Sequence, residues 1–139
     1  MPEHRHARGI VDTSVLLDLE RIDPWALPAE IAVSALTLAE LAAGPHATSD
    51  PAERARRQER LQRVEATFET VAVDAAVARA YGRIYAAVAA AGRKARGRRA
   101  LDLLIAATAL ATGLPLYTHN LDDFAELGDL LEIVAVEIS

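Results

Sequence analysis

Residues 100–118, ALDLLIAATALATGLPLYT, decide the fold class of this chain. The nearly all-apolar run 101–112 predicts a buried helix, and Gly113 is a typical residue for its end. Residues 115–118 then predict a short strand. Asp102 and two threonines interrupt the apolar run, so we do not expect this segment to cross a membrane.

Strands and helices alternate along the rest of the chain. Short runs of β-branched and apolar residues predict four further strands, at residues 9–12, 31–34, 70–73 and 132–136. Helical patterns lie between them at residues 15–20, 37–43 and 122–126, in a longer helix that begins at Asp50 and Pro51, and in another capped by Asp74. Because strands separated by helices need crossover connections, we expect an α/β fold with a mostly parallel sheet of about five strands, covered on both faces.

Length and composition suit one compact domain. The chain has 139 residues, of which 52% are hydrophobic and 25% are charged. We expect a single domain over residues 9–139, preceded by a flexible extension over residues 1–8. The absence of cysteine excludes disulfides and cysteine-ligated zinc. The polar, basic N-terminus lacks the apolar stretch of a signal peptide, so we expect a cytoplasmic protein.

Acidic residues stand at or just after the ends of several predicted strands, where ligands gather in open parallel sheets. They are Asp12, Glu40, Asp102, Asp122 and Asp123, with Asn120 beside the last two. Asp102 is the most informative because its neighbours are apolar, and a buried carboxylate without a partner is costly. A divalent cation would resolve the repulsion among converging carboxylates, and oxygen ligands select Mg²⁺ or Mn²⁺ over zinc.

Such a site suits the hydrolysis of a phosphodiester. A bound metal holds a phosphate oxygen, lowers the pKa of a bound water and stabilises charge at phosphorus. Each acid also has a simpler interpretation when it is taken alone. Asp12 could be a capping residue, Glu40 a solvated helix residue, and Asp102 a helix N-terminal residue stabilised by the dipole. Asp122 and Asp123 could be exposed turn residues, so the metal hypothesis depends on the whole set.

A basic segment leads directly into Asp102. It holds five cations within seven residues: Arg93, Lys94, Arg96, Arg98 and Arg99. The formal net charge of the chain is −5, so cations do not cover the whole protein. Cations beside an acidic metal site are suited to hold the phosphates of a polyanion, and we expect this segment to contact RNA. The alternative is a solvated, mobile loop.

Four sequence blocks, in this order, resemble those of PIN-domain nucleases. They are DTSVLL at 12–17, TLAEL at 37–41, ALDLLIAATA at 100–109 and THNLDDF at 118–124. The last block and the small size are similar to the VapC branch of toxins. The resemblance covers residues 9–139, and it implies an α/β/α sandwich and a Mg²⁺ site, with Mn²⁺ as an alternative.

The resemblance also assigns roles to individual residues. Asp12, Glu40 and Asp102 match the first three acids of the family. Many PIN domains carry the fourth acid at the position of Asn120, whereas the VapC variant has it just before the phenylalanine. We therefore expect Asp123 to be the fourth acid, with Asn120 as a polar contributor and Asp122 as the second candidate for the fourth acid. Residues that could orient carboxylates or waters are Thr13, Ser14 and Thr118.

The resemblance further implies a function and partners. Members cleave RNA such as tRNA, rRNA or mRNA, form homodimers, and are neutralised by a VapB-type antitoxin whose C-terminal tail occupies the site. We expect no membrane partner. The function expected is therefore that of a Mg²⁺-dependent endoribonuclease, the toxin of a toxin–antitoxin pair.

Three other functions share part of this pattern. A phosphoryl-accepting receiver domain needs adjacent acids after its first strand and a lysine after its last, but the only lysine is Lys94. A haloacid-dehalogenase-type phosphatase needs a second aspartate at the position of Ser14. A non-catalytic module that binds nucleic acid or a partner, and that retains the fold and the metal site, stays open as the alternative.

Overall fold

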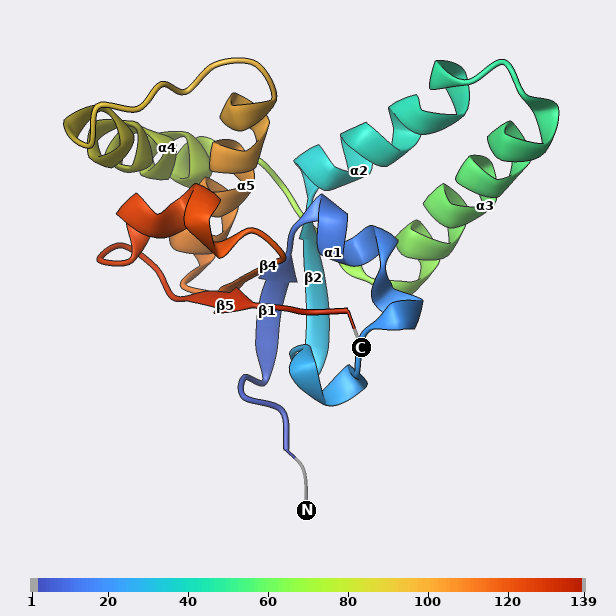
Figure 1. Cartoon of the computed structure of the whole chain (residues 1–139), viewed down its shortest axis with the longest axis horizontal. Helices are drawn as coiled ribbons and strands as arrows, with labels where there is room; N and C mark the ends of the chain where they lie inside the picture. Colours follow the sequence, from blue (N-terminus) through green and yellow to red (C-terminus); the bar gives the residue numbers. More distant parts are fainter. Residues whose placement is uncertain (1–2, 139) are drawn as a thin grey trace.

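The structure, a computed structural model, describes residues 3–138 and contains one five-stranded sheet (Figure 1). All neighbouring strands are parallel and follow the order β3-β2-β1-β4-β5. The strands are β1 (Arg8–Val11), β2 (Glu30–Ser34), β3 (Glu69–Val71), β4 (Leu116–Thr118) and β5 (Ile133–Ala135). The predicted α/β class and the five-stranded parallel sheet are confirmed.

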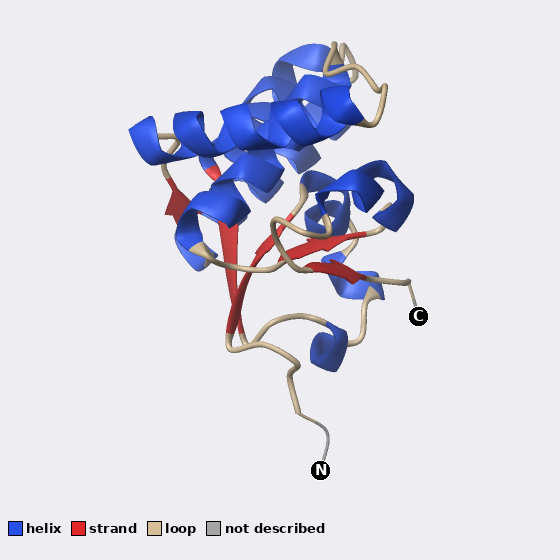
Figure 2. Ribbon diagram, turned by 90° about the vertical axis from the view of Figure 1, so that its left-hand side faces the viewer, coloured by secondary structure: helices blue, strands red, loops and turns tan. Residues whose placement is uncertain are grey.

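Helices cover both faces of the sheet and make a three-layer α/β/α arrangement (Figures 1 and 2). The helices are α1 (Thr13–Leu17), α2 (Ala35–Ala43), α3 (Pro51–Thr67), α4 (Ala75–Ala90) and α5 (Arg98–Thr112). Short 3₁₀ turns are η1 (Leu19–Arg21), η2 (Pro24–Ala26), η3 (Gly44–Ala47) and η4 (Leu121–Leu127). Within residues 3–138, no helix combines the length and the apolar character needed to span a membrane.

The core has two parts, one on each face of the sheet. Ile10 and Leu116 face α4 and α5, where they join Ile84 and Leu103 in one buried cluster. Their chain neighbours Val11 and Tyr117 face the opposite way and pack with residues of α1 and α3. Because successive side chains of a strand point to opposite faces, a sheet covered on both sides needs consecutive apolar residues.

The starts of two helices differ from the prediction. Helix α1 begins at Thr13, two residues before the predicted start at residue 15, and Asp12 caps it because its carboxylate accepts the backbone N–H of Val15. Helix α5 begins at Arg98, three residues before the predicted start at Leu101. Gly97 precedes it with a φ of 58°, a left-handed conformation that suits glycine and turns the chain into the helix.

The strand order explains where a site can form. From β1 the chain winds outward through β2 to β3, and it then returns to the other side of β1 to add β4 and β5. The connections after β1 and β4 therefore leave the sheet in different directions. A crevice at the carboxyl ends of these two central strands is the usual ligand position in such sheets.

The N-terminal segment, expected to be a flexible extension over residues 1–8, contacts the domain over its described part. His4 Nδ1 lies 2.8 Å from the Leu27 carbonyl oxygen. Backbone bonds from Ala29 to His6 and from Glu30 to Ala7 bring the chain to β1, which begins at residue 8 instead of 9. The sequence did not show these contacts because their partners lie far along the chain. Residues 1 and 2 lie outside the described residues.

Candidate active site

Residues from distant parts of the sequence surround one small cavity of about 70 Å³. It lies where β1 and β4 end, at the crevice set by the strand order. Five of the residues predicted to form the acidic site or to support it come from the segments that directly follow these strands, and Asp102 comes from α5. The lining residues are Asp12, Thr13, Ser14, Arg98, Asp102, Asn120, Asp123 and Phe124.

Asp12 is almost fully buried, with 8% of its surface exposed. Its Oδ1 accepts two hydrogen bonds, from the Val15 backbone N–H at 3.1 Å and from the Ser14 hydroxyl at 2.8 Å. The capping interpretation of Asp12 is therefore correct as a structural description. It does not exclude a metal ligand, because within residues 3–138 Oδ2 makes no hydrogen bond and keeps its lone pairs.

Glu40 is held from two sides. The Thr13 hydroxyl donates to Oε1 at 2.8 Å, and Arg98 pairs with Oε2 at 3.0 Å. Thr13 also lies 3.0 Å from the Thr37 hydroxyl, so both threonines support the carboxylate. Glu40 lines a neighbouring cavity, and Thr13 and Arg98 line both cavities. The guanidinium of Arg98 thus supplies a positive charge among the acids.

The charges of three acids, Asp12, Glu40 and Asp123, act on the fourth, Asp102. Burial raises the pKa of Asp102, and the nearby charges of Asp12, Glu40 and Asp123 raise it further, while Arg98 acts in the opposite direction. The alternative for Asp102, stabilisation by a helix dipole, predicts a lowered pKa and a place in the first turn. Asp102 is the fifth residue of α5 and therefore stands in its second turn. Asp102 therefore lies outside the first turn, where the helix dipole acts most strongly, and burial dominates its pKa.

The donor chemistry fits a hard divalent cation. As the side chains stand, no group of three or more His, Asp or Glu residues within residues 3–138 forms a coordination cluster. Three aspartates nevertheless line one cavity, and Arg98 is the one basic residue among the described residues that line it. Carboxylate oxygens without thiol ligands are the donors that Mg²⁺ and Mn²⁺ prefer. The residues present therefore suit such an ion.

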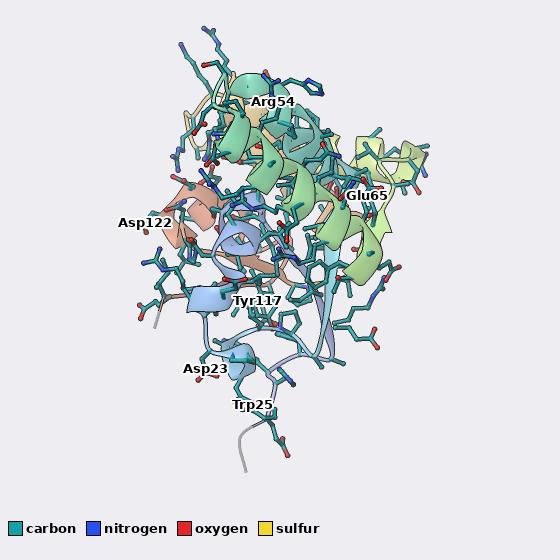
Figure 3. All side chains as sticks on the ribbon, turned by 90° about the vertical axis from the view of Figure 1, so that its right-hand side faces the viewer. Asp23, Trp25, Arg54, Glu65, Tyr117 and Asp122 are labelled. Carbon is teal, nitrogen blue, oxygen red and sulfur yellow. The ribbon has the colours of Figure 1, made fainter. Side chains whose placement is uncertain are left out.

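The residues after β4 divide between the cavity and the surface. Asp123 and Asn120 line the cavity, whereas Asp122 is exposed and lies at the outer edge of the molecule in Figure 3. Thr118 is fully buried, and its hydroxyl accepts the backbone N–H of Asn120 at 3.1 Å. Thr118 thus shapes the turn that carries the polar residues.

The predicted RNA-binding segment is not a uniform loop. Arg99 and Arg93 both pair with Glu126 of η4, and only 8% of the Glu126 side chain is exposed. Arg98 pairs with Glu40 beside the acid cavity. Lys94 and Arg96 are exposed. Two of the five cations therefore hold α5 and the preceding loop against η4, while the others face solvent or the site.

Sequence reasoning missed two supporting residues. Thr37 precedes Glu40 by three positions on α2, and side chains with this spacing share one face of a helix. That spacing was a usable signal. Glu126 gave no such signal, because its partners lie 27 and 33 residues away.

Known proteins are similar to this chain in sequence. The PIN domain family model matches residues 9–130. Ribonuclease VapC5 of Mycobacterium tuberculosis is 36% identical over 135 residues, which cover 95% of this chain and 96% of that protein. Ribonuclease VapC8 of the same species is 36% identical over 110 residues, which cover 78% of this chain and 96% of that protein.

Solved structures are similar as well. A chain of VapBC-5 from Mycobacterium tuberculosis, a toxin–antitoxin system, superposes with a TM-score of 0.81 at 38% identity, covering 94% of this chain and 99% of that one. VapBC2 from Rickettsia felis, bound to a DNA fragment, gives 0.73 at 23% identity, covering 91% and 96%, and supports the fold alone. With the family model spanning most of the sequence and the relatives matched over nearly their whole length, this chain belongs to the PIN-domain family, among the VapC ribonucleases.

Proposed function

We propose that this protein is a Mg²⁺-dependent endoribonuclease and acts as the toxin of a toxin–antitoxin pair. The observation that carries the proposal is the placement of Asp12, Asp102 and Asp123 around one small cavity, with Glu40 close enough to raise the pKa of Asp102. Similarity over nearly the whole length to ribonucleases VapC5 and VapC8 supports the reaction class.

Each residue of the site has a part in this activity. Asp12, Asp102 and Asp123 would hold the cation, with Glu40 as the fourth acid. A bound Mg²⁺ or Mn²⁺ supplies Lewis-acid activation of the phosphate and of the attacking water. Ser14 fixes the rotamer of Asp12 through its hydrogen bond, and Thr13 fixes that of Glu40. These hydroxyls keep the carboxylates in place before the ion arrives.

The proposal extends to partners. Arg98 lines the acid cavity, and Lys94 and Arg96 are exposed in the segment that leads into α5, so their positive charges suit an RNA backbone. The similar VapBC structures come from toxin–antitoxin systems, and they support a VapB-type antitoxin as the cognate partner. We also propose a homodimer, which would place two sites in each assembly.

The decisive experiment incubates the purified protein with total RNA and Mg²⁺ or Mn²⁺, with and without chelator. The neighbouring acids Asp123 and Asp122 offer a matched pair, since only the first lines the cavity. We expect Asp12→Ala, Asp102→Asn and Asp123→Asn each to lower cleavage by at least about 100-fold. Asp122→Asn should cleave like the wild type.

Two results would contradict the proposal. Cleavage that survives both the chelator and the substitutions would point to a contaminant or to another mechanism. RNA binding without cleavage under any metal condition would favour the non-catalytic binding module.

A further inference from the structure

A second cavity of about 300 Å³ adjoins the acid cavity and shares Thr13 and Arg98 with it. We name it the α2–α3 cavity because residues of these two helices form most of its wall. Figure 3 looks onto α3, which crosses the front of the molecule between the labelled Arg54 and Glu65. The charged residues that line the cavity are Glu40, Glu53, Arg57, Arg60 and Arg98.

The two acids of this cavity are already neutralised. Glu53 accepts hydrogen bonds from Arg56 at 2.7 Å and from Arg57 at 3.1 Å, and these bonds lower its pKa. Glu40 pairs with Arg98 and accepts a hydrogen bond from Thr13. Among the described residues that line the α2–α3 cavity, the positive charge left without an acidic partner is therefore that of Arg60.

Arg60 differs from the arginines around it on α3. Arg57 pairs with Glu53 and donates to the Gly44 carbonyl, and Arg63 pairs with Glu59. Within residues 3–138, Arg60 has no hydrogen bond or ion pair, although its side chain is only partly exposed. A partly buried, unpaired guanidinium suits a ligand with two acceptor oxygens, such as a phosphate.

Arg98 can bind a second anion while it keeps its ion pair with Glu40. Its ion pair with Glu40 uses Nη2, and 68% of its side chain is exposed. A guanidinium has five N–H donors, so the others stay available to a second anion. Because Arg98 lines both cavities, an anion that it binds in the α2–α3 cavity would lie next to a phosphate bound at the acid cavity through a cation.

We propose that the α2–α3 cavity is a second phosphate site, in which Arg60 and Arg98 hold an RNA backbone phosphate adjacent to the one that is cleaved. This rests on the proposed ribonuclease function. The RNA then runs from the acid cavity across Arg98 onto α3. A path over Arg93 and Arg99 is less suitable because both already pair with Glu126.

The test measures RNA binding without cleavage. A fluorescein-labelled RNA oligonucleotide is titrated with the Asp102→Asn protein in Mg²⁺, and its anisotropy is followed at several salt concentrations. Adding Arg60→Gln should weaken binding by at least about 10-fold and reduce the slope of log K against log salt by about 1. Arg60→Lys retains the positive charge but loses the planar set of N–H donors. Its RNA affinity should therefore lie between that of the Asp102→Asn protein and that of the same protein with Arg60→Gln.

The matched control is Arg63→Gln, one turn further along α3. Arg63 is 58% exposed and already paired with Glu59, so its loss should change the RNA affinity less than about 2-fold. Circular dichroism melting of each variant verifies that the fold is kept. If Arg60→Gln unfolds, the comparison of Arg60→Lys with Arg63→Lys replaces it.

The outcomes separate the two proposals. If the wild type cleaves RNA but Arg60→Gln binds it with unchanged affinity and salt slope, the phosphate site is overturned and the ribonuclease stands. If the wild type neither binds nor cleaves RNA, both fall. If Arg60→Gln keeps RNA affinity but loses affinity for polyglutamate, the cavity takes an acidic protein segment, and the phosphate site is likewise overturned.

Discussion

Arg98 and Arg99 are consecutive residues at the start of α5, yet they lie in two very different regions. The Arg98 side chain is 68% exposed and pairs with Glu40 between the two cavities. The Arg99 side chain is 18% exposed and pairs with Glu126, which is itself 8% exposed. Successive residues of a helix point about 100° apart, so one turn presents identical charges to a site and to a buried contact.

Arg98 and Arg99 are the same residue type, so their different roles follow from their different ion-pair partners. Glu126 lies on η4, three residues after Asp123, and it receives both Arg99 and Arg93. This contact fixes η4 against α5, and so it holds Asp123 close to Asp102. The Arg98–Glu40 pair joins no comparable buried contact, so it can rearrange when an ion or a phosphate binds.

The largest effect on stability should come from Glu126→Ala. Removing this carboxylate leaves Arg99 largely buried without its partner, and breaking such a pair costs about 3 kcal/mol of unfolding free energy. Urea denaturation followed by circular dichroism measures the change. Arg98→Ala, which removes an exposed partner, should cost less than about 1 kcal/mol.

Glu59→Ala is the control for the loss of a glutamate. Glu59 is 71% exposed and pairs with Arg63 on the same helix, so its removal should change stability by about 0.5 kcal/mol or less. Similar losses for Glu126→Ala and Glu59→Ala would remove the distinction between a buried and an exchangeable ion pair.

An effect of intermediate size is expected on the Glu40 side, from Thr13→Val. The substitution removes the hydroxyl that donates to Glu40 at 2.8 Å and leaves Arg98 as the remaining charged partner. Loss of such a supporting bond typically weakens metal binding about 10- to 100-fold. Calorimetric titration with Mn²⁺ measures the affinity. Thr112→Val, at the far end of α5, should bind Mn²⁺ like the wild type, and equal affinities for all three proteins would disprove the role of Thr13.

The smallest effect concerns Asp102 in the metal-free protein. Its pKa is raised in the folded state, so between the unfolded and folded pKa values the native protein binds more protons than the unfolded chain. Stability therefore falls as the pH rises through this window. Asp102→Asn lacks this titration, and its stability relative to the wild type should increase with pH and be greatest at neutral pH.

Urea denaturation in the presence of chelator, repeated across this pH range, tests the sign. Saturating Mg²⁺ should reverse the order of stability, because only the wild type retains all four carboxylates for the ion. An Asp102→Asn protein that is less stable than the wild type at neutral pH without metal would contradict the repulsion among the acids.

Much of this arrangement follows from local sequence. The predicted ends of the strands lie within two residues of those in the structure. Consecutive apolar residues such as Ile10 and Val11 identify these strands, because a sheet covered on both faces needs them. The gathering of Asp12, Asp102 and Asp123 at one cavity follows from the rule that parallel strands share one carboxyl edge.

The remaining features depend on contacts between distant segments. The run from Arg93 to Arg99 gave no indication that Glu126 would hold two of its arginines, because that pairing depends on how η4 packs against α5. The start of α5 at Arg98 was missed because a run of charges beside Gly97 suggested a solvated loop. Arg60 gave no signal either, since its neighbours on α3 carry the same charge and find partners.

The position of β1 in the middle of the sheet has a consequence for the synthesis of the protein. Asp12 emerges from the ribosome early, but β4, its neighbour in the sheet, and Asp123 are translated near the end. A growing chain therefore carries no assembled acid cavity until the C-terminal residues are made. For a protein proposed to cut RNA, this order means that the acid cavity can form only after Asp123 has been translated.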